Sequence, residues 1–225
     1  MCAAMNSFPI KLLILDENLS QNEIPSFRGA IINSVSSDSS PLFHNHLSDE
    51  SLRYSYPMVQ YKTIDGKAAV LCIGEACDHI DDLHVLNGSV LDITRRSFVF
   101  RTMKFISTTE EVTVTDELCQ YSIRNWVALN TDNYSIYRQL PTLSDKIQFL
   151  ENILVGNILS FAKGMGVNFD KEIICRMTDF PTTKIVKVKG VPVTAFDMDF
   201  VTNVHLPEFI GLGRNVSFGF GVISR

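Results

Sequence analysis

One short stretch of the chain constrains the fold more than any other. Residues 56–74 read YPMVQYKTIDGKAAVLCIG, with two β-rich runs on either side of the dipeptide Asp65-Gly66. Such a dipeptide supplies the backbone geometry of a tight turn between antiparallel strands. The stretch therefore predicts a β-hairpin, and the segments before and after it set the fold class.

Those neighbouring segments alternate between strand and helix patterns. Residues 10–17 (IKLLILDE) predict a buried strand, and residues 26–35 predict a short helix with Ser26 as its N-cap. Beyond the hairpin, residues 75–86 predict a second helix and residues 89–107 predict one or two further strands. The resulting order, β-α-β-β-α-β, is that of a ferredoxin-like unit.

The second half of the chain repeats this order in part. Residues 143–164 predict the strongest helix, which Ser144 can cap and Gly164 can end. Residues 182–204 predict two strands joined at Lys189-Gly190, but a second helix is harder to place. We predict an α+β chain of two ferredoxin-like units, residues 1–108 and 109–225, with antiparallel sheets and helices on one face. The apolar face of the long helix consists of Ile147, Leu150, Leu154, Ile158 and Phe161.

Four glycines fall close together in residues 206–225, LPEFIGLGRNVSFGFGVISR. Successive N–H groups in such a loop can form an anion-binding nest, and a cation and a hydroxyl lie within it. A dinucleotide-binding loop would follow an early strand and open a helix, and a P-loop would end in Lys-Ser/Thr, so neither fits. The alternative is a tight turn between strands that binds nothing. The residues concerned are Gly211, Gly213, Arg214, Ser217, Gly219 and Gly221.

Two of the five histidines, His44 and His46, lie one residue apart in the polar stretch PLFHNHLSDE. If this stretch is extended, both side chains share a face, with Cα atoms about 6.5–7 Å apart. Three interpretations stay open: a metal clip, a general acid/base pair, or a solvated loop. A metal clip needs a third ligand, for which Asp49 or Glu50 is available.

The net charge of −5 taken alone counts against a nucleic-acid partner. The distribution of charge is more informative, because residues 93–109 contain four cations and no acid. In a strand, Lys187 and Lys189 share one face, whereas Lys184 is out of phase with them. A basic hairpin and an ordinary solvated face are both compatible with this pattern. The cations of the first cluster are Arg95, Arg96, Arg101 and Lys104.

Several features predict a cytoplasmic protein. The five cysteines are scattered and odd in number, as expected for reduced thiols. No apolar run approaches the roughly 18 residues of a membrane span. The N-terminus does not have the pattern of a signal peptide.

The pattern G-x-G-x-x-x-S-x-G-F-G formed by residues 211–221 resembles the glycine-rich signature of the CRISPR-associated repeat-RNA endoribonucleases of the RAMP superfamily. Four further stretches resemble the type I-B-like branch of these enzymes. They are FRGAI (27–31), FHNH (43–46), YPMVQYK (56–62) and NWVALN (125–130). The resemblance therefore extends over nearly the whole chain and implies tandem ferredoxin-like, RRM-type domains.

The resemblance also implies a reaction. Such enzymes cut the repeats of a CRISPR transcript without a metal or cofactor: a 2′-hydroxyl attacks the adjacent phosphate, leaving a 2′,3′-cyclic phosphate and a 5′-hydroxyl. Closely spaced histidines serve there, and they correspond here to His44 and His46. Histidine suits both proton transfers because its ordinary pKa is near neutrality. The candidate RNA-binding residues are Arg28, Lys62, Arg95, Arg96, Lys184, Lys187 and Lys189 together with Gly211, Gly213, Arg214, Ser217, Gly219 and Gly221.

The expected partners are CRISPR repeat RNA and other CRISPR-associated subunits, and we expect a monomer or homodimer in the prokaryotic cytoplasm. Two alternatives are retained. One is a non-catalytic RAMP subunit that binds RNA in an interference complex. The other is a small metal-dependent enzyme that uses His44 and His46 as ligands.

Overall fold

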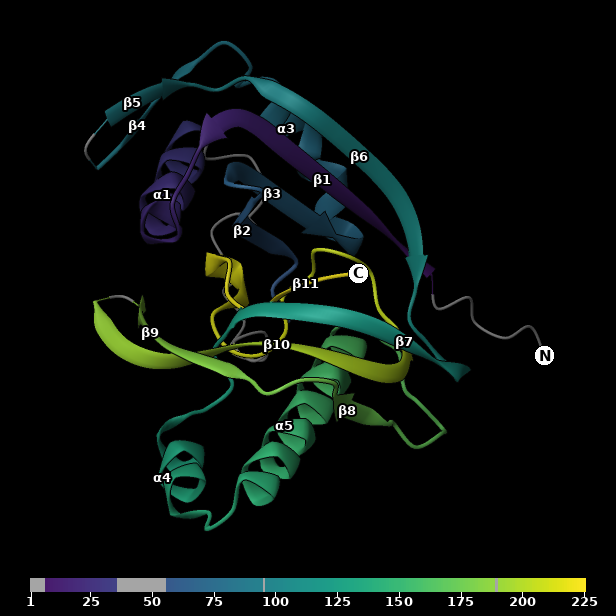
Figure 1. Cartoon of the computed structure of the whole chain (residues 1–225). Helices are drawn as coiled ribbons and strands as arrows, with labels where there is room; N and C mark the ends of the chain where they lie inside the picture. The colour runs from purple at the N-terminus through teal and green to yellow at the C-terminus, as the bar shows by residue number, and fades with distance from the viewer. Residues whose placement is uncertain (1–6, 36–55, 95, 189) are drawn as a thin grey trace, which may run out of the picture. The chain divides into compact units, whose positions relative to one another are not determined.

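The computed structural model describes residues 7–35, 56–94, 96–188 and 190–225 (Figure 1). The described residues form two compact units. The N-terminal unit contains Ser7–Glu110 together with Ser217–Gly219, and the C-terminal unit contains Glu111–Val216 and Phe220–Arg225. A short turn from the glycine-rich segment is thus part of the N-terminal unit. Among the described residues, no helix is both long and apolar enough to cross a membrane.

The N-terminal unit is built on a four-stranded sheet with the order β2-β3-β1-β6. The predicted hairpin is confirmed: β2 and β3 pair antiparallel from Val59↔Cys72 to Ile64↔Lys67. Asp65 and Gly66 both have positive φ, 50° and 77°, as a two-residue turn of the primed type requires. The strands are β1 (Ser7–Asn18), β2 (Val59–Ile64), β3 (Lys67–Ile73) and β6 (Thr102–Glu111).

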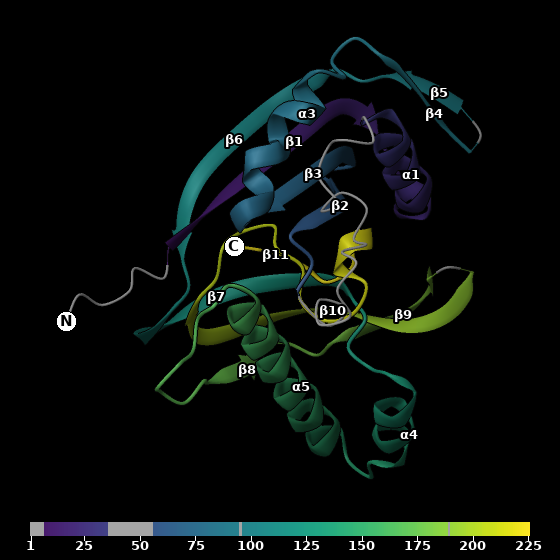
Figure 2. The same cartoon turned by 180° about the vertical axis from the view of Figure 1, so that it is seen from behind.

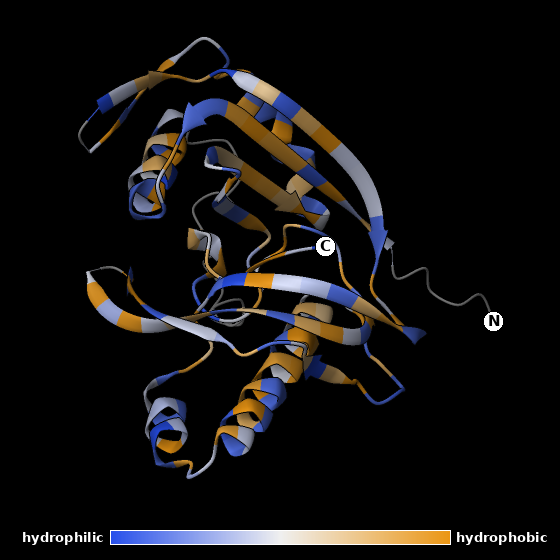
Figure 3. Ribbon diagram, in the orientation of Figure 1, coloured by the Kyte–Doolittle hydropathy of each residue, from blue (hydrophilic) through white to orange (hydrophobic). Residues whose placement is uncertain are grey.

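The helices of this unit cover one side of the sheet (Figure 2). Leu13 and Leu15 of β1 share a buried cluster with Phe27 of the first helix and Leu83 of the last. Figure 3 shows β1 and β3 hydrophobic over most of their length, as expected for strands at the centre of a core. The helical segments are η1 (Gln21–Glu23), α1 (Ile24–Ser34), η3 (Gly74–His79) and α3 (Ile80–His84).

Two details of this unit differ from the sequence-based expectations. The first helix begins at Ile24, so the prediction of Ser26 as its N-cap was wrong. Instead, the Ser20 N–H donates to Glu23 Oε2 at 2.9 Å, and Ser20 caps the start of the preceding turn η1. The segment predicted as one or two strands contains three, because a separate hairpin precedes β6. This hairpin consists of β4 (Val90–Ile93) and β5 (Arg96–Val99).

The C-terminal unit repeats the same strand order. Its sheet runs β11-β7-β10-β8, and β9 pairs with the first half of β10 (Figure 1). The last strand lies beside the first, and the third separates the first from the second, as in the N-terminal unit. The prediction of two ferredoxin-like units is therefore confirmed. The strands are β7 (Thr113–Trp126), β8 (Cys175–Met177), β9 (Thr182–Val188), β10 (Val191–His205) and β11 (Val222–Ser224).

The helix that was hard to place is absent from the C-terminal unit, whose residues 206–221 are all described. Between β10 and β11, where the second ferredoxin helix would lie, the glycine-rich segment contains only the three-residue turn η4 (Val216–Phe218). The first crossover carries two helices, α4 (Thr131–Gln139) and α5 (Leu143–Gly164). Sequence reasoning predicted α5 but missed α4.

The long helix α5 confirms the predicted apolar face. Leu150, Leu154, Ile158 and Phe161 are buried in it. Its N-cap is Thr142 rather than the predicted Ser144, because the Thr142 hydroxyl accepts a hydrogen bond from the Asp145 N–H at 3.1 Å. The predicted turn between β9 and β10 is also present, since Val188 pairs with Val191.

Candidate nucleic-acid interface

The two histidines predicted to be catalytic, His44 and His46, lie outside the described residues, as do Arg95 and Lys189. The described chain stops at Val35, just after α1, and resumes at Tyr56, just before β2. The histidine-bearing segment is therefore joined to α1 at one end and to β2 at the other. These two elements are the described parts of the candidate site.

Helix α1 contributes Arg28, one of the predicted RNA-binding residues. Its guanidinium carbon lies 5.0 Å from the centroid of the Phe218 ring, which is the distance of a cation–π contact. Phe218 is the last residue of η4, and its carbonyl accepts a hydrogen bond from Gln21 Nε2 at 2.8 Å. Both Arg28 and Phe218 are half-buried. The glycine-rich segment and the cation of α1 thus meet within the N-terminal unit.

Gly219 follows Phe218 and packs directly on β2. Its φ is +75°, and a Cβ at this position would lie 2.7 Å from Ile24 Cδ1 and 3.1 Å from Lys62 Cα. Such a close approach leaves no room for a larger residue, and the left-handed backbone favours glycine as well. Contact with the N-terminal unit therefore accounts for this glycine.

Strand β2 contributes a chain of hydrogen bonds between buried polar side chains. Lys62 Nζ donates to Gln60 Oε1 at 2.8 Å, and Gln60 Nε2 donates to Tyr56 Oη at 2.8 Å. Lys62 and Gln60 are each 0% exposed. Burial lowers the pKa of the Lys62 ammonium to about 7, because the charged form loses its hydration. A direct contact between Lys62 and RNA stays a prediction, but here the ammonium lies inside the protein.

The other three glycines of the segment lie in the C-terminal unit. A Cβ on Gly221 would lie 1.9 Å from Leu212 O, and Leu212 N–H donates to Gly221 O at 2.8 Å. Gly211 and Gly213 also pack against side chains of their own unit. Close packing accounts for these glycines without a ligand, as the tight-turn alternative expects. An anion-binding nest in this segment stays a prediction.

The polar residues of the same segment are more accessible. Arg214 is exposed, and its backbone N–H is held by Val127 O at 3.1 Å. Ser217 is half-buried beside Phe218. Arg214 therefore presents a cation to solvent from a fixed backbone position.

The β9–β10 hairpin carries the second predicted basic cluster. Lys187 is exposed opposite Pro192, whereas Lys184 Nζ lies 2.5 Å from Asp197 Oδ2. The two lysines point to opposite faces of β9, as the strand periodicity predicted. The exposed face also carries Ile185, which is 70% exposed. Lys187 is thus the more available of the two ammonium groups for a phosphate.

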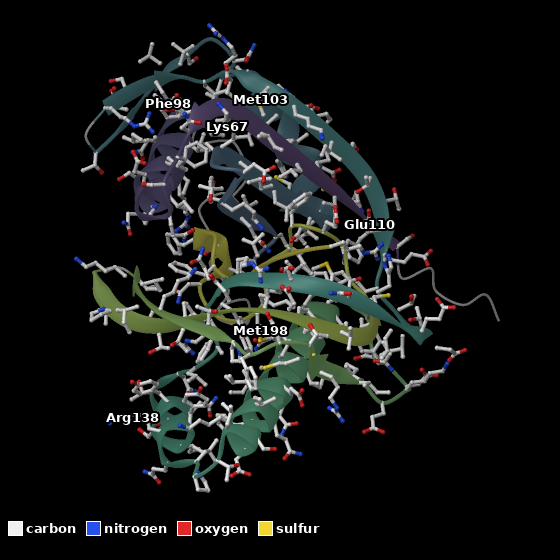
Figure 4. The ribbon with its side chains drawn as sticks, in the orientation of Figure 1. Lys67, Phe98, Met103, Glu110, Arg138 and Met198 are labelled. Atoms are coloured by element: carbon white, nitrogen blue, oxygen red, sulfur yellow. The ribbon has the colours of Figure 1, made fainter. Side chains whose placement is uncertain are left out.

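Arg96 is a predicted RNA-binding residue that the structure places among carboxylates. Its guanidinium pairs with Glu17 and Glu23, the latter at 3.0 Å. A similar pair joins Lys67, labelled in Figure 4, to Asp16 at 3.0 Å. Glu17 and Glu23 neutralise Arg96 locally, so the first basic cluster, to which Arg96 belongs, offers RNA less charge than its sequence indicates.

Sequence reasoning missed three residues of this region: Gln21, Gln60 and Phe218. Gln60 and Phe218 both lie within the stretches that carried the family resemblance, which was an available signal. Within the described ranges, no cluster of three His, Cys, Asp or Glu side chains could hold a metal ion. The metal interpretation of His44 and His46 concerns residues outside those ranges.

Two ferredoxin-like units, the second closed by a glycine-rich segment instead of a helix, place the chain among proteins with the RAMP fold. The chain belongs to the Cas6b family: residues 7–111 match the model of the Cas6b N-terminal domain, and residues 113–225 match that of the Cas6b C-terminal domain. The family predicted from the glycine-rich pattern is therefore confirmed.

The chain is also similar to individual proteins and solved structures. The chain is 36% identical over 117 residues to the uncharacterized protein MJ0978 of Methanocaldococcus jannaschii, a match that covers 52% of this chain and 78% of that protein. A crystal structure of Cas6b superimposes with a TM-score of 0.85 at 25% identity, covering 97% of this chain and 99% of the other. A CRISPR RNA processing endoribonuclease Cas6b has the same fold, with a TM-score of 0.73 at 23% identity, covering 96% and 98%.

Proposed function

We propose that the chain is an endoribonuclease that cuts CRISPR repeat RNA and thereby generates guide RNAs. The observation that carries this proposal is the match of both halves of the chain to the Cas6b family, over residues 7–111 and 113–225. One solved relative is described as a CRISPR RNA processing endoribonuclease. The pair His44 and His46 adds a chemical argument, because imidazoles can give and take protons near neutral pH. The pair lies in the segment of the sequence that joins α1 to β2.

The proposed reaction is a phosphoryl transfer within the RNA. One imidazole of the pair His44 and His46 removes the proton of a 2′-hydroxyl, and the 2′-oxygen bonds to the adjacent phosphorus. The bond from phosphorus to the 5′-oxygen breaks, and the other imidazole gives that oxygen a proton. The products are a 2′,3′-cyclic phosphate and a 5′-hydroxyl, and neither metal nor cofactor takes part. A histidine suits each step because its ordinary pKa lies near neutrality.

Cations near the scissile phosphate stabilise the extra negative charge of the transition state. Arg28 fits this role by position, because its helix leads directly into the histidine-bearing segment. Lys187 and Arg214 present exposed cations for other phosphates of the RNA. Such local cations allow a chain of net charge −5 to bind RNA.

The proposal also covers the oligomeric state, the cellular location and the partners of the enzyme. It acts as a monomer or homodimer in the prokaryotic cytoplasm, where the transcript is made, and it passes its product to other CRISPR-associated subunits. Light scattering on the chain alone and with repeat RNA measures the oligomeric state. A stable larger assembly of the chain alone would contradict this part of the proposal.

The decisive experiment incubates the chain with labelled CRISPR repeat RNA in EDTA. We expect cutting at one site, and we expect His44→Ala and His46→Ala to abolish cutting while the Kd for RNA changes little. His79→Ala is the matched control, because His79 lies on η3 and pairs with Asp82 at 3.7 Å. Binding without cutting by the unmodified chain would favour the non-catalytic subunit. Cutting only after a metal is added would overturn the proposed mechanism.

A further inference from the structure

We propose that Phe218 is a positioning residue for Arg28. Its ring holds the guanidinium in the orientation that contacts the RNA backbone. The glycine-rich segment therefore acts on RNA through α1 as well as through any phosphate it binds itself. This inference rests on the proposed function, because it assigns a role to a residue beside the same candidate site.

The first support is the geometry of the pair. The guanidinium carbon of Arg28 lies 5.0 Å from the centroid of the Phe218 ring. An arginine that stacks on an aromatic face keeps its N–H donors in the plane of the guanidinium, and the Nε atom of Arg28 is itself buried. The ring also restricts a side chain that otherwise has many rotamers.

The second support is that Phe218 is itself held on two sides. Gln21 Nε2 donates to the Phe218 carbonyl at 2.8 Å, although the two residues lie 197 positions apart in the sequence. The next residue, Gly219, packs on the backbone of β2 at distances that leave no space for a Cβ. The backbone of Phe218 is thus held at its carbonyl and at the following residue. The Phe218 ring can therefore keep a fixed place beside the Arg28 guanidinium.

The third support is the surroundings of Arg28. Burial raises the pKa of the Tyr61 hydroxyl, and the positive charge of Arg28 acts in the opposite direction. Among the described residues, the Tyr61 hydroxyl has no hydrogen-bond partner. The titratable groups on the side of the sheet that faces α1 include Tyr61 and Cys72, whereas the side chain of Lys62 points to the opposite side of the sheet. Arg28 brings a cation to this face, which favours an anionic ligand here.

The test begins with the contact itself, in the absence of RNA. The Nε–Hε signal of Arg28 in an NMR spectrum experiences the ring current of Phe218. We expect Phe218→Leu to move this signal, and Phe218→Tyr, which keeps the ring, to move it far less. Phe180→Leu is the matched control, because the Phe180 ring is 69% exposed in the C-terminal unit. An unchanged signal in Phe218→Leu would overturn the proposal.

The second stage measures repeat-RNA affinity and the single-turnover cutting rate. We expect Phe218→Leu to weaken binding about fivefold, as for loss of a partly exposed cation–π contact, and Phe218→Tyr to restore it. In an Arg28→Ala background, Phe218→Leu should add no further loss, because its effect passes through Arg28. An equal loss in both backgrounds would refute the positioning role.

The two stages separate the failure of this inference from the failure of the proposed function. If the unmodified chain neither binds nor cuts repeat RNA, the proposed function fails, and the role of Phe218 toward RNA fails with it. If the unmodified chain cuts RNA but Phe218→Leu cuts and binds equally well, only the positioning role fails. Thermal unfolding of each variant shows that the fold is intact before either comparison.

Discussion

The ammonium group of Lys62 donates a hydrogen bond to Gln60 Oε1 at 2.8 Å, and neither side chain has any exposed surface. Burial lowers the pKa of Lys62 to about 7, far below the value of about 10.5 for a lysine in water. The protein thus keeps, next to the turn formed by Ser217–Gly219, a lysine that changes charge near neutral pH. This arrangement has a measurable effect on stability.

We predict that the titration of Lys62 makes the free energy of unfolding increase as the pH rises from 7 to 8.5. In this window the unfolded chain binds a proton at Lys62 that the folded chain increasingly releases, so the free energy of unfolding increases with pH. The slope is at most about 1.4 kcal/mol per pH unit. Lys62→Met should therefore show a flatter pH profile and a higher stability at pH 7, measured by urea unfolding.

The window ends at pH 8.5 because buried thiols act in the opposite direction above it. Burial raises the pKa of Cys72, Cys77 and Cys175, so stability falls once these thiols would ionise in the unfolded chain. Their effect is common to both proteins and cancels in the comparison. Parallel pH profiles for Lys62→Met and the unmodified chain would contradict the prediction.

Gly221→Ala should destabilise the C-terminal unit severely. The new Cβ would lie 1.9 Å from Leu212 O, and φ at this position is +65°. We expect a loss of about 3 kcal/mol or more, because a backbone clash cannot be relieved by a rotamer change. Gly156→Ala in α5 is the control, since nothing lies within 4 Å of its added Cβ. That change should stabilise the helix by about 0.5–1 kcal/mol. Similar melting temperatures for the two variants would contradict this account.

Lys187 and Lys184 should differ in their effect on RNA binding. Lys187→Ala removes an exposed ammonium, so we expect weaker binding and a salt dependence of log K reduced by about 0.7–0.9. Lys184→Ala should change the slope less, because the Lys184 ammonium is paired with Asp197. Filter binding at several salt concentrations measures both slopes. An equal reduction in the two variants would show that the ion pair with Asp197 does not determine whether the Lys184 ammonium can contact RNA.

Glu23 should contribute to stability at neutral pH but not at low pH. Hydrogen bonds from Ser20, together with Arg96, lower the pKa of the Glu23 carboxyl to about 2. A carboxyl whose pKa is lowered in the folded state stabilises that state at pH values above the ordinary pKa of the group. This contribution is lost as the pH falls toward 2. We expect Glu23→Gln to cost about 1 kcal/mol or less at pH 7, because solvent screens the group. At pH 3 the cost should be smaller, and a pH-independent difference in urea unfolding would exclude the ionic contribution.

The parts of the fold that depend on local sequence could be predicted. Asp65-Gly66 determines its hairpin because the turn geometry involves only adjacent residues. The two missed caps had a local signal, since Ser20 and Thr142 each precede an acidic residue by three positions, the pattern of a capping box. Ser26 and Ser144 have the right residue type but lie within the helices.

The parts that depend on distant contacts could not be predicted. The glycine-rich segment occupies the place of the second ferredoxin helix. That place is defined by the order of all four strands, so the segment's own residues do not indicate it. The contact between Arg28 and Phe218 joins opposite ends of the sequence. Lys62 was predicted to bind RNA, a role that needs an exposed ammonium group. In β2, however, the residues on both faces are buried.

The membership of Ser217–Gly219 in the N-terminal unit has a consequence for protein synthesis. A ribosome finishes residues 7–110 about a hundred residues before it reaches this turn, a delay of roughly 5–20 s at typical rates of protein synthesis. During that time the nascent N-terminal unit has neither the Phe218 ring beside Arg28 nor Gly219 against β2. A half-made chain therefore does not have the contact between Arg28 and Phe218. If this contact orients Arg28 toward RNA, as we propose, the order of translation delays the capture of RNA until nearly the whole chain exists.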